Sequence, residues 1–352
     1  MKRKLSIAFI GFLLVVSCGK DKDQTPEFDK GEMLAQIADN VILPAYQGFS
    51  VEVTALEASL NAFHATPTAE NLQVLRDQWK NTARSWQHVK LFNFGPAMDY
   101  ALKTSVGIFP CDTALIQSNI TAGSYDLNAA TNASAAGLFA LDYLLFQGNT
   151  LSASQNNANY RAYCLAVTQK IKSEVSNVLN AWGSFRSTFI ASTGNESTSM
   201  FSMLVNDYCQ DYEEAKTAKL GIPIGKYSLD ILQPQYIEAR YSGFSLDLLY
   251  ESMTVLRDVY RGIGPNGVNG VGFDDYLIAL DKSTLDQNIV NNYNSILSDI
   301  SSFSGTLETE MQNNLPALNA LFTKISNQVI ALKTDMTAAF GVLITYQDND
   351  GD

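Results

Sequence analysis

The chain has 352 residues, and its 36 acidic and 24 basic side chains give a formal net charge of −12 at pH 7. This acidity argues against nucleic acid or an anionic lipid surface as a partner, because both repel negative charge. The charge could concentrate cations, although we favour solubility as its role. The length exceeds what one hydrophobic core normally serves, so we expect two folded units.

The extreme N-terminus is typical of a secretory signal. Three basic residues, 2–4, precede an apolar stretch from Leu5 to Val16 that is too short to span a bilayer as a mature helix. We therefore predict a signal peptide over residues 1–17.

Cys18 is the predicted lipid anchor. Val15-Val16-Ser17-Cys18 fits a bacterial lipobox, and acyl chains on this cysteine would hold the protein on a membrane. The alternative is a plain signal peptide with an incidental cysteine. The polar residues 18–29 are expected to form a flexible tether. Gly19 is not the Asp associated with inner-membrane retention, so we expect the outer membrane, with the periplasmic or surface face left open.

Apolar residues recur with helical spacing almost throughout the chain. Thr66-Pro67 offers a cap and a first-turn proline for one long helix. The apolar stripe of this helix advances in steps of three and four residues and consists of Leu72, Leu75, Trp79, Ala83, Trp86, Val89 and Phe92. Further long helices are predicted over residues 160–189, 197–220, 242–260, 285–303 and 316–340.

No alternating apolar run framed by Asn-Gly or Asp-Gly turns predicts a sheet. We therefore predict an all-α protein with two helical units, at 30–194 and 195–352, divided within the polar segment 192–199. Three cysteines follow the predicted signal, at Cys111, Cys164 and Cys209. An odd number leaves at least one free thiol, so no disulfide framework organises the fold, and any single pairing stays open.

Several chemical motifs lack the context that their chemistry needs. Residues 262–267 spell Gly-x-Gly-x-x-Gly, but they follow a predicted helix instead of a strand, which favours an inter-helix loop over a ligand-covering one. Residues 348–352 resemble the start of a calcium loop without its bidentate Glu, which favours a solvated acidic end. His64 and His88 are the only histidines, and we expect His64 at a helix end or surface and His88 facing solvent. Neither lies near a nucleophile motif or a zinc-type spacing.

Residues 137–146, Gly-Leu-Phe-Ala-Leu-Asp-Tyr-Leu-Leu-Phe, resemble the Gly-x-His-x-x-Glu signature of imelysin-like proteins. Phe139 stands where the family has His, and Asp142 stands where it has Glu. Other similar segments occur in the expected order: residues 39–46, then Trp79 to Pro96, Glu213 to Gly225, and Arg240 to Asp247. The resemblance spans about residues 36–250. It implies two helical-bundle domains with a site between them.

The resemblance also implies a set of candidate site residues. These are Arg84, Lys90 (where the family has Glu), Phe139, Asp142, Tyr241, Ser242 and Asp247. An imidazole three residues before a carboxylate places two metal ligands on one helical face, but Phe139 cannot bind a metal, so only Asp142 remains as a candidate metal ligand. We consider two hypotheses for Lys90 and Asp142: an internal ion pair that replaces a metal cluster, or residues that merely join two helices.

Three functions follow from the resemblance. The first is a non-enzymatic envelope lipoprotein that acts as a binding component in iron, haem or metal uptake, with iron as the candidate cofactor and envelope iron-uptake proteins as partners. The second is a scaffold or interaction protein that has lost its ligand. The third, a metallopeptidase, is the weakest because a zinc peptidase needs the His and Glu ligands that are replaced here. No catalytic residue is assigned.

Overall fold

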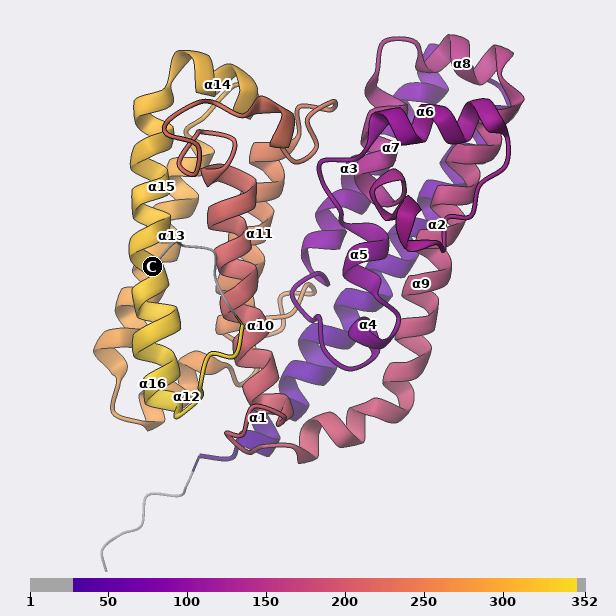
Figure 1. Cartoon of the computed structure of the whole chain (residues 1–352). Helices are drawn as coiled ribbons and strands as arrows, with labels where there is room; N and C mark the ends of the chain where they lie inside the picture. Colours follow the sequence, from indigo (N-terminus) through magenta and orange to yellow (C-terminus); the bar gives the residue numbers. More distant parts are fainter. Residues whose placement is uncertain (1–27, 347–352) are drawn as a thin grey trace, which may run out of the picture.

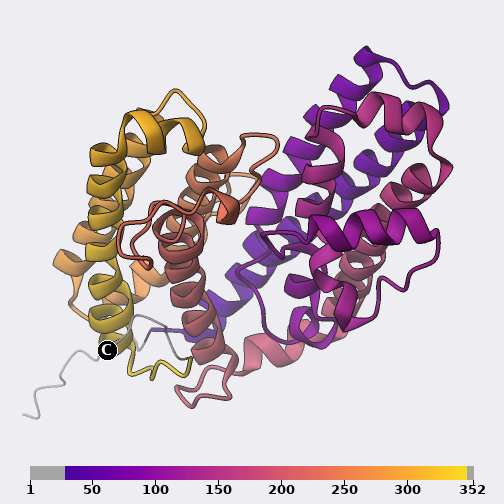
Figure 2. The ribbon, with the colours of Figure 1, turned by 45° about the horizontal axis from the view of Figure 1, so that its top comes forward.

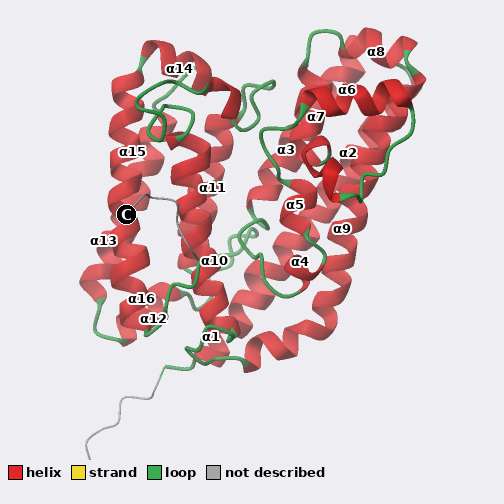
Figure 3. Cartoon of the chain, in the orientation of Figure 1, coloured by secondary structure: helices red, strands yellow, loops and turns green. Residues whose placement is uncertain are grey.

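The computed structural model describes residues 28–346, and helices account for its regular structure (Figure 3). Within these residues the β pairing amounts to a single antiparallel bridge between Ile263 and Asn269. The all-α prediction is therefore confirmed. The predicted signal peptide, Cys18 and the acidic end at 348–352 lie outside the described residues. Every helix within 28–346 is too short or too polar to span a lipid bilayer.

The first group of helices is built around the long helices α2, α3 and α9. Helix α2 packs against both α3 and α9, and α7 packs against α3 and α9. The elements are α1 (Lys30–Gln36), a π-helical segment (Ile37–Ile42), α2 (Leu43–Ala65), α3 (Ala69–Gln87), α4 (Pro96–Asp99), α5 (Leu102–Val106), α6 (Thr113–Ala122), a 3-10 turn (Ala130–Ala135), α7 (Gly137–Phe146), α8 (Thr150–Asn156) and α9 (Ala158–Ala191).

The second group follows after residues 192–199, within which the predicted domain boundary falls. Helix α13 packs against α11 and against α15. The elements are α10 (Met200–Glu214), a π-helical segment (Ala215–Gly221), a 3-10 turn (Pro234–Tyr236), α11 (Ser245–Tyr260), α12 (Phe273–Ala279), α13 (Ser283–Ser301), α14 (Leu307–Asn313), α15 (Leu315–Val329), a π-helical segment (Ile330–Met336) and α16 (Thr337–Phe340).

The two bundles stand side by side and remain distinct when the molecule is turned (Figures 1 and 2). They touch mainly where α3 meets α11 and where α9 meets α10. Phe28 stacks on Tyr276 of the second bundle with ring centroids 4.6 Å apart, and the Asp29 side chain caps α1. These two residues therefore belong to the folded part and not to the predicted tether.

The predicted apolar stripe of α3 is buried in full, from Leu72 to Phe92. Two details of this helix differ from the prediction. Thr68, not Thr66, caps the helix by accepting a hydrogen bond from the Asn71 amide, and the helix ends at Gln87, so that Val89 and Phe92 continue the apolar face from a turn. Burial of large apolar side chains contributes more stability than helix propensity does. Val89 and Phe92 therefore remain buried although the backbone leaves the helix after Gln87.

Candidate functional site

Helix α7 carries the resembled signature, and aromatic side chains from α3 and α9 fix its position. The Trp79 indole donates a hydrogen bond to the Leu138 carbonyl at 3.0 Å, and the Tyr160 hydroxyl donates to the Leu144 carbonyl at 2.6 Å. Gly137 begins the helix at φ +82°, and a β-carbon there would lie 2.5 Å from the Val106 carbonyl oxygen. Only glycine tolerates that backbone and that approach.

Asp142 projects from α7 toward the second bundle, where it binds backbone. Its two carboxyl oxygens accept hydrogen bonds from the amides of Tyr241 and Ser242, each at 3.0 Å, and its side chain is almost fully buried. Burial raises the pKa of Asp142 to about 7, while the hydrogen bonds from Ser242 and Tyr241 oppose this rise. Asp142 therefore joins the two bundles and carries a charge that depends on pH near neutrality.

We expect the stability of the wild type, relative to Asp142→Asn, to fall as the pH rises from about 4 to about 7. The raised pKa means that the folded chain keeps a proton which the unfolded chain releases over this range, so the stabilisation present at low pH is lost. The slope should approach about 1.4 kcal/mol per pH unit, measured by urea unfolding of both proteins. Parallel curves for the wild type and Asp142→Asn would contradict the prediction.

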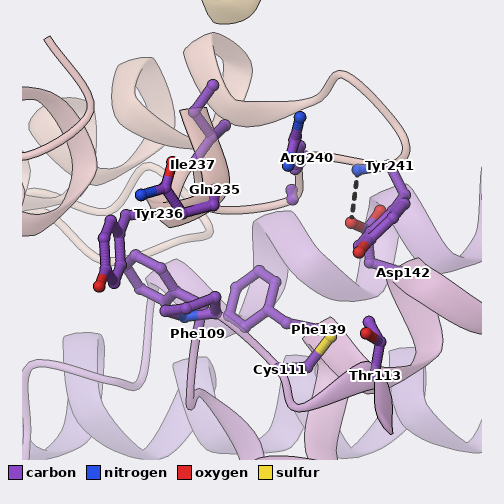
Figure 4. Close-up of a pocket in the computed structure, with 12 residues that line it drawn as sticks. Phe109, Cys111, Thr113, Phe139, Asp142, Gln235, Tyr236, Ile237, Arg240 and Tyr241 are labelled. Carbon is purple, nitrogen blue, oxygen red and sulfur yellow. Dashed lines mark hydrogen bonds between the residues drawn. The ribbon is translucent and has the colours of Figure 1, made fainter. Parts of the chain in front are cut away.

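A pocket of about 310 Å³ opens beside Asp142, between the two bundles. The first bundle lines it with Phe109, Pro110, Cys111, Thr113, Phe139 and Asp142, and the second with Gln235, Tyr236, Ile237, Ala239, Arg240 and Tyr241. Figure 4 shows Phe139 between Phe109 and Asp142, with the segment 235–241 above them. The Phe139 ring meets Phe109 edge to face at 5.3 Å between centroids. Phe139 is thus part of an aromatic wall.

Lys90 does not pair with Asp142, so the ion-pair hypothesis for these two residues is wrong. The Lys90 ammonium instead makes a buried salt bridge with Asp211 of α10, and their side chains are 3% and 2% exposed. Lys90 lies in the turn after α3, and this turn faces α10 across the bundle interface. Each of the two residues joins the bundles separately, Lys90 through Asp211 and Asp142 through the backbone amides of Tyr241 and Ser242.

Two more lysine–carboxylate pairs lie close to Lys90 and were not recognised in the sequence. Lys219 and Glu238 form a salt bridge within the second bundle, with side chains 0% and 1% exposed. Lys103 of α5 binds Glu214 of α10 at 2.5 Å between the bundles. The sequence held one signal for them, since acidic and basic residues alternate with Tyr and Ala from Asp211 to Lys219, and charges on a helix that becomes buried need partners.

Two further polar contacts, made by Arg84 and His88, lie at the more exposed edge of the interface. Arg84 of α3 binds Asp247 of α11 at 3.2 Å, with both side chains about half exposed. His88 was expected to face solvent, but its Nε2 lies 2.8 Å from Glu251 Oε1. Half-buried His64 lies near the end of α2 as expected, and burial lowers its pKa to about 4. The predicted site residues thus fall into one interface without forming one cluster.

The residues around Asp142 do not fit a metal ion held by protein ligands alone. Within residues 28–346, no group of three or more His, Cys, Asp or Glu side chains is arranged to hold one. The candidate ligand Asp142 is the only such carboxylate that lines the pocket, beside the Cys111 thiol, whose pKa burial raises to about 12. The cysteines at 111, 164 and 209 are all free thiols.

Comparison with known proteins agrees with the resemblance seen in the sequence. The Imelysin family model (Peptidase_M75) matches residues 42–334. Iron-regulated protein A of Synechococcus elongatus is 23% identical over 266 residues, which is 72% of this chain and 70% of that protein.

Two solved structures share the fold. A candidate iron-regulated protein A precursor from Parabacteroides distasonis has a TM-score of 0.74 at 18% identity, covering 90% of this chain and 97% of its own. An imelysin-like protein from Psychrobacter arcticum has a TM-score of 0.73 at 17% identity with the same coverage. With the family model matching most of its length, the chain belongs to the imelysin family.

Proposed function

We propose that this chain is a non-enzymatic, lipid-anchored envelope protein that acts as a binding component connected with iron uptake. We further propose that its ligand is a small organic molecule, with or without bound iron, held in the pocket beside Phe139 and Asp142. The pocket carries this proposal, because both bundles contribute to its wall at the site of the family signature.

The pocket has the size and lining of a small-molecule site. Its volume of about 310 Å³ lies at the lower end of the range for such sites, which combine apolar and aromatic walls with a few polar groups. The polar groups here include Thr113 and Gln235. A bare metal ion would need several carboxylate or imidazole ligands, and the lining offers Asp142 alone.

The connection with iron and the envelope has two sources. A relative and a solved neighbour are both named iron-regulated protein A. The N-terminal residues 2–18 have the charge, apolar length and cysteine of a lipoprotein signal. These observations support an anchored binding protein with Cys18 as the acylated residue. Gly19, which is not the Asp associated with inner-membrane retention, supports the outer membrane as its place.

The arrangement of the polar residues favours binding over catalysis. A zinc peptidase needs a histidine and acidic ligands near a base for the bound water, and the resemblance of residues 137–146 to the family signature assigns Phe139 to the place of that histidine. His88 is engaged by Glu251 at 2.8 Å and does not line the pocket.

A scaffold or interaction role is the second candidate, and one exposed turn favours it. Leu229 and Asp230 both have left-handed backbones, and the turn is closed by a hydrogen bond from the Ile231 amide to the Ser228 carbonyl. Leu229 is 95% exposed and Ile231 62% exposed. These two exposed aliphatic side chains on one turn give another protein an apolar point of contact.

Thr113→Trp should abolish ligand binding, because the indole would fill the pocket from the start of α6. We expect native mass spectrometry of the full-length wild-type protein, isolated from its own cells under iron limitation, to show a bound organic molecule. The dissociation constant should rise at least about tenfold in Thr113→Trp, the equivalent of about 1.4 kcal/mol, so that the bound molecule is lost during isolation. Thr121→Trp, an exposed position on the same helix, is the matched control and should keep the ligand. A wild type that carries only a metal ion, or a ligand that Thr113→Trp retains, would refute the proposal.

A further inference from the structure

The pocket presents aromatic faces from both bundles. Phe109 and Phe139 form one side, and Tyr236 and Tyr241 form the other, with these two tyrosines 42% and 41% exposed. In Figure 4 the Tyr236 ring lies beside Phe109 at one end of the lining, and Tyr241 lies at the other. Aromatic side chains prefer stacked or edge-to-face partners, so these faces suit a ligand with a flat ring.

The pocket lining holds one carboxyl group and one guanidinium, and the carboxyl group is already engaged. Asp142 is buried, and each of its carboxyl oxygens already accepts a backbone amide. Arg240 is the only basic residue among the lining residues, and in the described chain its guanidinium donates one hydrogen bond, from Nη2 to Glu308 at 3.0 Å. The guanidinium also lowers the pKa of Tyr241 against the raising effect of burial, so its charge reaches the phenol at the pocket. Most of its five N–H donors remain to bind an anion.

Glu308 is therefore a competitor for the same guanidinium. The Arg240 and Glu308 side chains are 36% and 40% exposed, so the pair is only partly withdrawn from water and holds the arginine weakly. A carboxylate ligand can accept two parallel hydrogen bonds from an arginine, whereas Glu308 accepts one from Arg240. The two-bond interaction is the stronger of the two, so a ligand can displace Glu308.

Buried interactions hold the pocket wall that carries Arg240. Residues 235–241 are fixed by the salt bridge of Glu238 with Lys219 and by the Tyr241 amide on Asp142. The Lys219 ammonium also lies 5.9 Å from the centre of the Phe109 ring, which ties this wall to the opposite one. A wall fixed in advance loses little conformational entropy when a ligand binds.

We infer that the pocket selects planar aromatic carboxylates, with the ring held among Phe109, Phe139, Tyr236 and Tyr241 and the carboxylate bound by Arg240. This inference rests on the proposed function and names the chemical class of its ligand. The size of the pocket admits one or two fused rings.

Binding of 1-naphthoate to the full chain, followed by its fluorescence anisotropy, tests the inference. We expect saturable one-to-one binding. Two comparison probes separate the requirements for the charge and for the ring: 1-naphthylmethylammonium has the ring with the opposite charge, and cyclohexanecarboxylate has the charge without the aromatic ring. Each, in competition with 1-naphthoate, should bind at least about tenfold more weakly. Equal or tighter binding of the ammonium probe would overturn the assignment of an anion.

Two variants move the affinity in opposite directions, which a purely structural effect would not do. Arg240→Gln should weaken 1-naphthoate at least about tenfold, whereas Glu308→Gln should tighten it severalfold by releasing the guanidinium. Arg257→Gln, which alters an arginine paired with Asp258 outside the pocket, should leave the affinity unchanged. Unchanged affinity in Arg240→Gln, or weaker binding in Glu308→Gln, would overturn the inference.

Failure of the ligand class can be distinguished from failure of the proposed pocket. If 1-naphthoate does not bind while Thr113→Trp still removes an organic molecule from the isolated protein, the ligand class is wrong and the pocket assignment stands. If neither effect is seen, both are wrong.

Discussion

Replacing Lys219 with methionine should lower the free energy of unfolding by about 3–5 kcal/mol. The Lys219 ammonium and the Glu238 carboxylate are 0% and 1% exposed, so the variant would leave Glu238 as a buried charge without its partner. Burial lowers the pKa of Lys219, and Glu238 opposes this by favouring the charged form. Urea unfolding at neutral pH would measure the loss.

Two matched variants separate the charge effect from the loss of packing. The double variant Lys219→Met with Glu238→Leu removes both charges and should recover much of the stability, because apolar residues can replace a buried pair at little cost. Lys226→Met should change stability by no more than about 0.5 kcal/mol, since Lys226 and Asp230 are 25% and 84% exposed and 3.4 Å apart. A loss below about 1 kcal/mol for Lys219→Met would contradict the prediction.

Lys90→Met should cost a similar free energy, about 3–5 kcal/mol, and should also loosen the contact between the bundles. Lys90 and Asp211 belong to different bundles, and both side chains are nearly inaccessible to water. The unpaired Asp211 would favour conformations in which the bundles separate and water reaches the carboxylate. Faster amide hydrogen exchange in α10 and in the turn after α3 would report this opening.

Arg84→Met is the control for Lys90→Met. Arg84 and Asp247 join the same two bundles, but at an edge where their side chains are 42% and 51% exposed. Arg84→Met should cost at most about 1 kcal/mol and leave hydrogen exchange in α10 unchanged. If Lys90→Met speeds exchange no more than Arg84→Met does, the buried pair does not hold the bundles together.

Most of the fold could be predicted from local patterns in the sequence. The stripe on α3 indicated its buried face, and the run from 160 to 189 lies within α9 (Ala158–Ala191). The predicted helix over 197–220 is realised by α10 and the π-helical segment that ends at Gly221. These predictions succeed because a helix buries residues three and four positions apart, and the sequence displays that spacing directly.

Among the short helices between Pro96 and Asn156, α4, α5, α6 and α8 were not predicted, and α6 contributes Thr113 to the pocket. Helices α4 and α5 have 4 and 5 residues, too few for an apolar period to show. Short helices gain their stability from tertiary contacts, so their sequences carry little local signal.

The sequence by itself determined the helical class, the buried faces of the long helices and the family. Only the tertiary structure decided which charges pair and where the pocket lies. Lys90 and Asp211 are 121 residues apart, and Asp142 and Tyr241 are 99 apart. Helical periodicity depends on neighbours within one turn, whereas a buried charge takes the partner that the packing of two bundles brings to it.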